Sequence, residues 1–362
     1  MGKRNRRMKK KRIVTVDMAR MFAIFCVILT HSVEGVWQMD VNSLNARKDS
    51  INLVILGLHT IGRMGVPVFM LLSGYLLLDR EYDKDKIIKF WKRNMAGLLI
   101  STEIWIIIYY IFSCWLYKQK LQIGEIIPEL LFYKNANANH LWYMGQIIGI
   151  YLFLPFVAIA LKEITRKMSY FITGIAFLYL GLQSTVNIFR AASGKEALSS
   201  QVNMNFIGGI YGILLILGWM IKKEYFEHVK TKILLIIMCI SYIGVLYVQI
   251  FAYKHHIEYS LWYDSGLLII ASVCLLIVIL RIKKVICKSL VTWFGYSSFA
   301  VYLIHNIFRM YFNKFMSDKH IFTSSGIVHF VMLFVVTMCL SNLAVLIISK
   351  NKKIAKVLFC MK

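Results

Sequence analysis

The sequence predicts an all-α polytopic membrane protein, and three observations support that prediction. Hydrophobic residues make up 59% of the 362 residues, whereas charged residues make up 17%. Apolar runs of about 20 residues, each long enough to cross a bilayer as a helix, recur along the whole chain. Lys and Arg gather in alternate connecting segments, as expected for a chain that crosses the membrane repeatedly. A soluble domain would instead show amphipathic stripes separated by polar turns.

About ten spanning helices are expected, joined by polar connections. The first follows the basic stretch "MGKRNRRMKKKR" and lacks a small-residue cleavage site, so a spanning helix is favoured over a signal peptide. The longest outer connection, 118–139, is expected to hold a short interfacial helix at 123–131. In chain order the expected spans are 13–37, 51–78, 94–117, 140–161, 169–188, 204–221, 233–253, 263–280, 297–312 and 325–349.

The positions of Lys and Arg predict the orientation. With the N-terminus inside, the inner segments hold 30 of the 43 Lys and Arg residues and the outer segments hold 10. The remaining three, Arg20, Arg63 and Arg309, lie within spans. This bias predicts that the N- and C-termini are both cytoplasmic.

The chain then divides into three parts. A basic cytoplasmic tail (1–12) precedes a single membrane domain (13–349), and a second basic cytoplasmic tail (350–362) follows it. The net charge of +25 is explained by this topology and by attraction to anionic lipid, so membrane lipid is an expected partner and nucleic acid is not. The seven cysteines show no metal-ligand spacing with His, and neither a phosphate loop nor a nucleophile elbow occurs, so no metal is expected.

Ionisable residues in the first span indicate a functional site, because such groups are costly at bilayer depth. Asp17, Arg20, His31 and Glu34 fall on one stripe, since eleven residues return a helix to within about 20° of its starting face. Glu34 is one turn from His31, and a carboxylate there would fix the imidazole tautomer and raise its basicity, as in a general base. A structural role for His31, as a capping or snorkelling residue at the outer interface, fits the sequence equally well.

The second span carries Arg63 near its middle, in "HTIGRMGVPVFMLLSGYLLL". Arg63 is too far from either end to snorkel, so it is expected to face the bundle interior or a wet cavity. Pro67 frees a backbone carbonyl nearby, and an arginine satisfied by such carbonyls is the structural alternative.

Other polar groups lie in the fourth and ninth spans. His140, Trp142 and Tyr143 open the fourth span and also suit an outer interfacial belt. The ninth span places His305 and Arg309 on one face with Ser298 and Tyr302, which suggests a cavity wall.

A basic cluster, "KIIKFWKRN", precedes the third span and contains Lys92 and Arg93. Such a cluster fits positive-inside anchoring, and it equally fits the phosphates of a nucleotide-like donor.

Five stretches, in order, resemble the acyltransferase-3 family of integral-membrane O-acyltransferases over most of the chain. They are "DMARMFAIFCVILTHS", "GRMGVPVFMLLSGYLLL", "FWKRN", "HLWYMGQIIGIYLFLPF" and "FGYSSFAVYLIHNI". The family's first helix carries an arginine, ten residues and a histidine, which Arg20 and His31 fit. Its basic pair at the start of the third helix fits Lys92 and Arg93. The chain is similar to the family's short form, made of the membrane domain alone, as in the enterobacterial-common-antigen O-acetyltransferase.

The resemblance implies a multi-pass O-acetyltransferase of the bacterial inner membrane. It implies acyl-CoA, usually acetyl-CoA, as a cytoplasmic co-substrate and no bound cofactor. The implied acceptor is a hydroxyl of an envelope glycan or lipid-linked sugar. In this view His31 is the catalytic residue, and we expect it to act as the general base. Our own hypothesis adds that Glu34, to which the resemblance assigns no role, orients His31 and that Arg63 or a nearby donor stabilises the oxyanion. The resemblance and the helix pattern together predict His31, Arg20, Glu34 and Arg63 as catalytic residues. They predict Lys92, Arg93 and Arg20 as donor-binding residues and His140, Trp142, Tyr143 and His305 as substrate-binding residues.

Several alternatives stay open. A related membrane domain is attached to serine racemases, so a transporter-like module for an amino acid or small solute would also use intramembrane charges. Dependence on acyl-CoA separates the two, because a carrier would not consume it. A lipid head group, peptidoglycan or a small metabolite is an alternative acceptor. A tunnel for the acyl group and an acyl-His31 relay are both compatible with the stripe.

Overall fold

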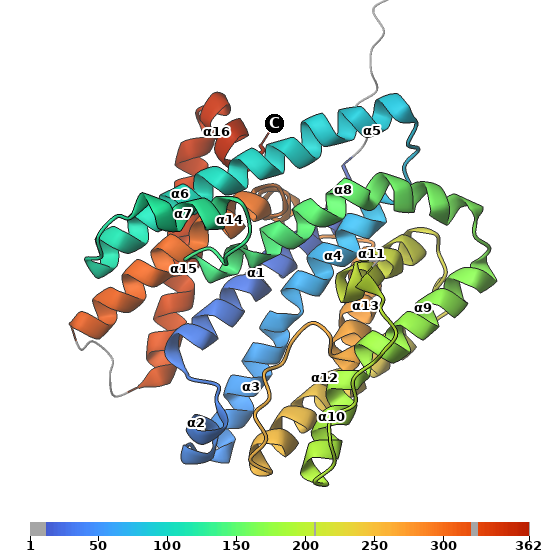
Figure 1. The fold of residues 1–362 in the computed structure, drawn as a ribbon, viewed down its shortest axis with the longest axis horizontal. Coiled ribbons are helices and arrows are strands. Elements are labelled where there is room, and N and C mark those ends of the chain that lie inside the picture. Colours follow the sequence, from blue (N-terminus) through green and yellow to red (C-terminus); the bar gives the residue numbers. More distant parts are fainter. Residues whose placement is uncertain (1–11, 206–207, 320–324, 362) are drawn as a thin grey trace, which may run out of the picture.

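The computed structural model describes residues 12–205, 208–319 and 325–361, which form helices and connecting loops without a strand (Figure 1). The long helices are α1 (Val14–Val36), α3 (Asp49–Arg63), α4 (Gly65–Leu77), α6 (Ala96–Tyr117), α8 (Trp142–Glu163), α9 (Arg166–Gly181), α11 (Gly209–Lys222), α12 (Thr231–Lys254), α13 (Gly266–Leu280), α14 (Lys288–Asp318) and α15 (Gly326–Ser349). The shorter ones are α2 (Val41–Ala46), α5 (Lys84–Phe90), α7 (Ile123–Leu130), α10 (Gln183–Ala192) and α16 (Lys352–Phe359), with a π-helical turn at Trp91–Met95 and a 3-10 turn at Asn139–Leu141.

Each of the ten predicted spans contains a helix, but the fifth is divided at Leu182 between α9 and α10, and the helix in the sixth, α11, begins at Gly209. Within the described ranges, seven helical segments are long and apolar enough to cross a membrane, and α11 and α13 are shorter apolar helices. The ninth predicted span lies within α14, which is 31 residues long. The prediction of a helical polytopic membrane protein is therefore confirmed, whereas the number of spans and the sides of the termini stay predictions.

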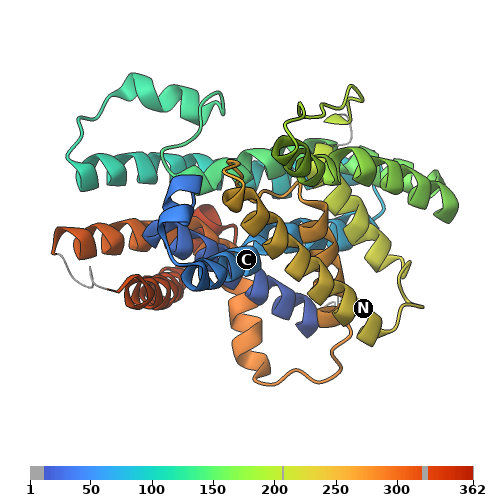
Figure 2. The same cartoon turned by 90° about the horizontal axis from the view of Figure 1, so that it is seen from below.

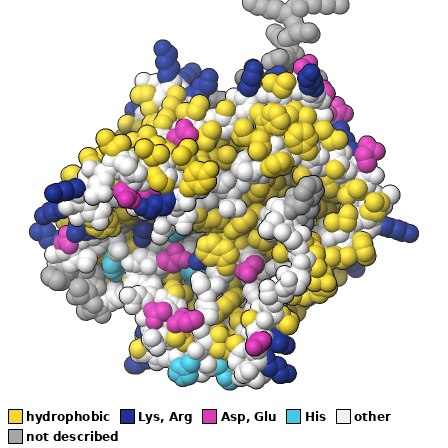
Figure 3. All heavy atoms as spheres, in the orientation of Figure 1, with side chains coloured by type: hydrophobic (Ala, Val, Ile, Leu, Met, Phe, Trp, Pro, Cys, Tyr) yellow, Lys and Arg dark blue, Asp and Glu magenta, His cyan; other side chains and the backbone are white. Residues whose placement is uncertain are grey.

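The surface of the molecule agrees with a membrane location. Figure 3 shows hydrophobic side chains over broad areas of one face, with Lys and Arg mostly toward its margins. Large apolar side chains such as Trp115, Phe171 and Ile240 are more than half exposed. Water would disfavour so much exposed apolar surface, but lipid chains would solvate it.

Helix α1 occupies the centre of the fold. It packs against α14, α15, α3 and α4, while Figure 2 shows α6, α8 and α9 in a row along one side of the bundle. Its buried residues include Asp17 near its beginning and Ser32 near its end. Of the polar stripe of the first span, Asp17 is therefore enclosed, whereas the side chains of Arg20, His31 and Glu34 are 36%, 23% and 32% exposed.

The second predicted span is broken at Met64 into α3 and α4. Pro67 has no N–H group with which to bond the carbonyl of Arg63, four residues earlier, so the helix is interrupted there. A Cβ atom on Gly62 would lie 2.8 Å from the backbone nitrogen of Thr30, and one on Gly65 would lie 2.7 Å from the carbonyl oxygen of Ala23. These glycines bring the break, and with it Arg63, close to α1.

The terminal segments differ in how far the structure describes them. The predicted basic tail at 1–12 lies outside the described residues except for Arg12, which pairs with Asp17. The predicted C-terminal tail contains α16, whose Phe359 is buried and stacks on Trp105 of α6. An apolar face on this short basic segment therefore packs it against the bundle.

Candidate active site

Three imidazole rings come together, one from α1, one from the turn before α8 and one from α14. The ring of His31 stacks on His305 of α14, with centroids 5.5 Å apart and planes inclined by 25°. His140, in the turn before α8, presents its edge to both, at 6.3 Å from His31 and 5.0 Å from His305. His140 and His305 are fully enclosed, whereas the side chain of His31 is 23% exposed. We call these three residues the histidine cluster.

Glu34 connects the histidine cluster to the break in the second span. One carboxylate oxygen, Oε2, lies 3.3 Å from Nδ1 of His31. The other, Oε1, accepts a hydrogen bond from Nη2 of Arg63 at 2.7 Å and lies 3.2 Å from Nε2 of His59. The predicted approach of Glu34 to His31 is therefore present in the structure, and the contacts with His59 and Arg63 add to it.

Arg63 is held on every side. Its Nε donates to Nε2 of His59 at 3.2 Å, and its Nη1 donates to the hydroxyl of Tyr263 at 3.3 Å. The guanidinium also lies over two rings, 5.0 Å from the centroid of Trp262 and 5.5 Å from that of Tyr263. Trp142 stacks on Tyr263 at 5.6 Å, which brings this predicted substrate residue to the same place. Arg63 thus faces the bundle interior, as predicted, with its charge paired.

A second set of hydrogen bonds holds His140 in place. Nε of Arg309 donates to Oδ1 of Asn306, and Nδ2 of Asn306 lies 3.2 Å from Nδ1 of His140. The hydroxyl of Tyr302 donates to the backbone carbonyl of His140. The predicted stripe on the ninth span therefore faces the histidine cluster. Asn306 was missed in the sequence, although its place next to His305 was a signal that could have found it.

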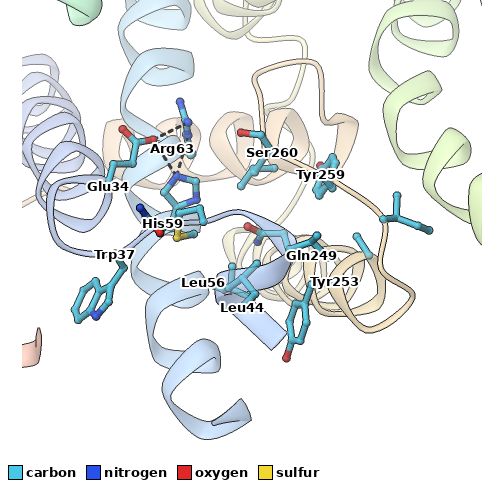
Figure 4. A pocket seen from close by; sticks show the side chains of 16 residues that line it. Glu34, Trp37, Leu44, Leu56, His59, Arg63, Gln249, Tyr253, Tyr259 and Ser260 are labelled. Atoms are coloured by element: carbon cyan, nitrogen blue, oxygen red, sulfur yellow. Dashed lines mark hydrogen bonds and ion pairs between the residues drawn. The ribbon is translucent and has the colours of Figure 1, made fainter. Parts of the chain in front are cut away.

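A cavity of about 210 Å³ opens beside the C-terminal end of α1 (Figure 4). We call it the outer cavity, after the predicted topology. Figure 4 shows Glu34, His59 and Arg63 on one side of it and Gln249 and Tyr253 across from them. Glu34 and Arg63 are the two charged residues among those that line it, so their opposite charges leave it close to neutral. The other polar lining side chains are Gln38, His59, Gln249, Tyr253, Tyr259 and Ser260.

A second cavity, of about 240 Å³, lies toward the N-terminal half of α1, and we call it the inner cavity. Arg20 lines it with Tyr143, Tyr151 and Tyr302. Arg20 also lies 3.6 Å from the carboxylate of Asp17, as the stripe predicts. The ring of Tyr302 lies 5.5 Å from that of His140. The three histidines are not among the residues that line either cavity, but His31 contacts Glu34 of the outer cavity and His140 contacts Tyr302 of the inner one.

The residues predicted to bind the acyl donor are only partly brought together. Arg20 lines the inner cavity, but Lys92 and Arg93 do not. Both lie exposed in the π-helical turn that leads into α6, whereas Leu98, in the next turn, does line the inner cavity. Lys92 and Arg93 are thus close in sequence to a residue that lines the cavity, but they do not line it themselves.

The whole bundle corresponds to one known domain. A family model described as an acyltransferase domain, the acyltransferase-3 type, matches residues 13–346. Neither a comparison with curated proteins nor one with solved structures gives a match. The match covers α1, which carries His31, and α14, which carries His305, so the site described above lies inside the domain.

Proposed function

Because the chain belongs to the acyltransferase-3 family and is a membrane acyltransferase, we propose that it transfers an acetyl group from cytoplasmic acetyl-CoA to a hydroxyl of a cell-envelope glycan or lipid-linked sugar in the bacterial inner membrane. The observation that carries the proposal is the position of His31. Its Nδ1 faces the carboxylate of Glu34, which lines the outer cavity, and its ring contacts His140, whose neighbour Tyr302 lines the inner cavity.

His31 acts as the general base in this proposal. A carboxylate accepts and does not donate, so Glu34 holds the proton of His31 on Nδ1 and leaves a lone pair on Nε2. That lone pair takes the proton of the acceptor hydroxyl as the oxygen attacks the thioester carbonyl carbon. The C–S bond then breaks, and the leaving thiolate takes the proton from the imidazolium to give free CoA. General base catalysis of this kind typically contributes about 10²–10⁴-fold in rate.

The inner cavity receives the donor in this proposal. Arg20 is the charged residue in its wall, and a guanidinium favours phosphate and thioester oxygens. The acyl-pantetheine end enters this cavity with the pyrophosphate at Arg20, while the adenosine end stays at the cytoplasmic surface near Lys92 and Arg93. Lys92 and Arg93 then attract the negative charge of acyl-CoA from outside the cavity wall.

The outer cavity receives the acceptor. Its paired charges and its uncharged polar groups suit a neutral, hydroxylated ring better than a phosphate or a carboxylate. Trp37, which also lines the cavity, offers an apolar face for such a ring. A sugar unit with a free hydroxyl has this chemistry.

The deciding experiment is turnover of acetyl-CoA by the purified, detergent-solubilised protein, with His31→Ala beside it and an envelope glycan extract as acceptor. Release of free CoA that needs both the acceptor and His31, with acetyl appearing on glycan, is the expected result. The transporter-like alternative has the same intramembrane charges in its favour. Tight binding of an amino acid without any consumption of acyl-CoA would support it and overturn the transferase proposal.

A further inference from the structure

Two ring nitrogens in the histidine cluster are buried and have no hydrogen-bond partner within the described residues. They are Nε2 of His140 and Nε2 of His305. Buried polar atoms in proteins are almost always paired, so unpaired ones call for an explanation such as a ligand or a catalytic role. Both nitrogens lie within the cluster that contains His31, where the reacting groups meet if the proposed function is right.

The hydrogen bonds around His140 decide its tautomer. Arg309 can only donate, so the atom of Asn306 that faces its Nε is the carbonyl oxygen Oδ1. The amide nitrogen of Asn306 must then face Nδ1 of His140, to which it donates at 3.2 Å. Since Nδ1 accepts, the ring is neutral and its proton is on Nε2. His140 therefore presents an unpaired N–H donor.

By the same reasoning, the proton of His305 is on the other ring nitrogen, Nδ1. Its Nδ1 lies 2.6 Å from the backbone carbonyl of Tyr302, which can only accept, so the proton is on Nδ1. No carboxylate forms an ion pair with His305 within the part of the chain that the structure describes. The neutral ring then has a lone pair on Nε2, as His31 does. The histidine cluster thus combines one donor, on His140, with two acceptors.

We propose that His140 donates its Nε2–H to the acyl carbonyl oxygen as that oxygen becomes negatively charged, and that Asn306 and Arg309 are positioning residues that hold His140 in this tautomer. This inference rests on the proposed function. The oxyanion forms when the acceptor oxygen bonds to the carbonyl carbon, and it collapses when the C–S bond breaks. His140 keeps its proton throughout, while the transferred proton passes through His31.

The geometry favours His140 over Arg63 for this role. The Nε, Nη1 and Nη2 groups of Arg63 are already directed at His59, Tyr263 and Glu34. Nε2 of His140, in contrast, has no hydrogen-bond partner within the described residues, and the nearby backbone carbonyl of Leu303 already accepts from the hydroxyl of Tyr109. Tyr302 lines the inner cavity and its ring lies 5.5 Å from that of His140, which itself is not among the lining residues, so the proposal requires the acyl group to pass Tyr302 to reach this donor.

The test combines spectroscopy with kinetics on the full chain in detergent. Nitrogen-15 NMR of histidine-labelled protein, with His140→Gln to assign the signal, reports which ring nitrogen carries the proton. We expect a protonated Nε2 in the unchanged protein. Asn306→Asp replaces the amide donor with a carboxylate that accepts, so the proton should move to Nδ1. Loss of one oxyanion donor typically lowers kcat by about 10²–10³-fold, and we expect a loss of that size with the KM for acetyl-CoA changed less than about threefold.

Two further variants separate a positioning role from a structural one. His140→Gln keeps an N–H donor and should retain more of kcat than His140→Leu, which has none. Asn342→Asp is the matched control, since Asn342 of α15 likewise lies within a span, where its amide donates to the backbone carbonyl of Met338, but it is not part of the cluster. It should leave turnover and the His140 signal unchanged.

Two results would overturn the inference, and they are distinguishable from failure of the proposed function. A proton on Nδ1 of His140 in the unchanged protein overturns it whatever the activity. Near-normal kcat in Asn306→Asp, with the proton moved, overturns the oxyanion role. If the unchanged protein transfers no acyl group from acetyl-CoA, the proposed function fails first and the oxyanion role fails with it, even with the tautomer as inferred.

Discussion

His31 and His305 stack ring on ring, with centroids 5.5 Å apart, although 274 positions separate them in the chain. The two rings differ in their partners. His31 has the carboxylate of Glu34 on its Nδ1, whereas His305 has a backbone carbonyl. A carboxylate stabilises the imidazolium that forms when a base takes a proton, and a neutral carbonyl does so much less. The stack therefore contains one histidine suited to accept a proton and one better suited to stay neutral.

His31→Ala should reduce acyl transfer by at least about 10²-fold, because it removes the proposed general base. The protein should keep its elution volume and its melting temperature, since His31 is partly exposed in the site. Release of CoA and acetyl incorporation measure the effect. His329→Ala is the control, because His329 lies on α15 outside the histidine cluster. Equal losses in the two variants would show that the effect is not specific to the site.

Glu34 and Arg63 should show thermodynamic coupling. Glu34→Gln leaves a buried guanidinium without its anion, and Arg63→Gln leaves the carboxylate without its closest cation, whereas the double variant leaves neither charge. The double variant should therefore be less destabilised than the sum of the single ones, by about 0.5–3 kcal/mol. Thermal unfolding in detergent measures this.

A control for this cycle is the ion pair of Glu125 and Lys134, whose atoms are 2.6 Å apart on the surface. Exposed pairs contribute little because water screens them, so its removal should barely change stability. Strict additivity at Glu34 and Arg63 would contradict the argument that their contact is energetically important.

Arg20→Gln should weaken binding of the donor. If Arg20 meets the phosphates of acyl-CoA, the KM for acetyl-CoA should rise about tenfold, which corresponds to one charge-assisted contact. The KM for S-acetyl-pantetheine, which has no phosphate, should change much less. Lys92→Gln and Arg93→Gln should have smaller effects than Arg20→Gln, because both residues lie outside the cavity wall. A similar rise for both donors would instead place Arg20 at the thioester end.

Gly74→Ala and Gly218→Ala should each destabilise the bundle. A Cβ on Gly74 would overlap the backbone carbonyl of Leu215, and a Cβ on Gly218 would overlap that of Leu71, so α4 and α11 would have to separate. Overpacking of this kind costs about 1–3 kcal/mol. A drop of several degrees in the melting temperature is the expected measurement.

The matched controls for these glycines are Gly149→Ala and Gly174→Ala. Both residues are helical, and a Cβ on either would meet nothing within 4 Å. Alanine is the better helix former by about 1 kcal/mol, so these variants should be neutral or slightly stabilising. Equal destabilisation in all four variants would contradict the close approach of α4 and α11.

The sequence by itself determined the fold class and one side of the site. Apolar runs of spanning length leave helices as the main way to satisfy the backbone in lipid, so the class follows from composition and spacing. Arg20, His31 and Glu34 lie on one helix, and the period of 3.6 residues places them on one face whatever surrounds them. The contact of Glu34 with His31 was predictable for the same reason.

The tertiary structure decided which residues meet across the helices. The contact of His31 with His140 and His305 depends on how α1, α8 and α14 pack, and helical period says nothing about that packing. The rings that cover Arg63 come from a loop about 200 positions away in the chain. Small residues such as Gly62 and Gly65 set how closely the backbones approach, and only the packed helices show which partner each glycine admits.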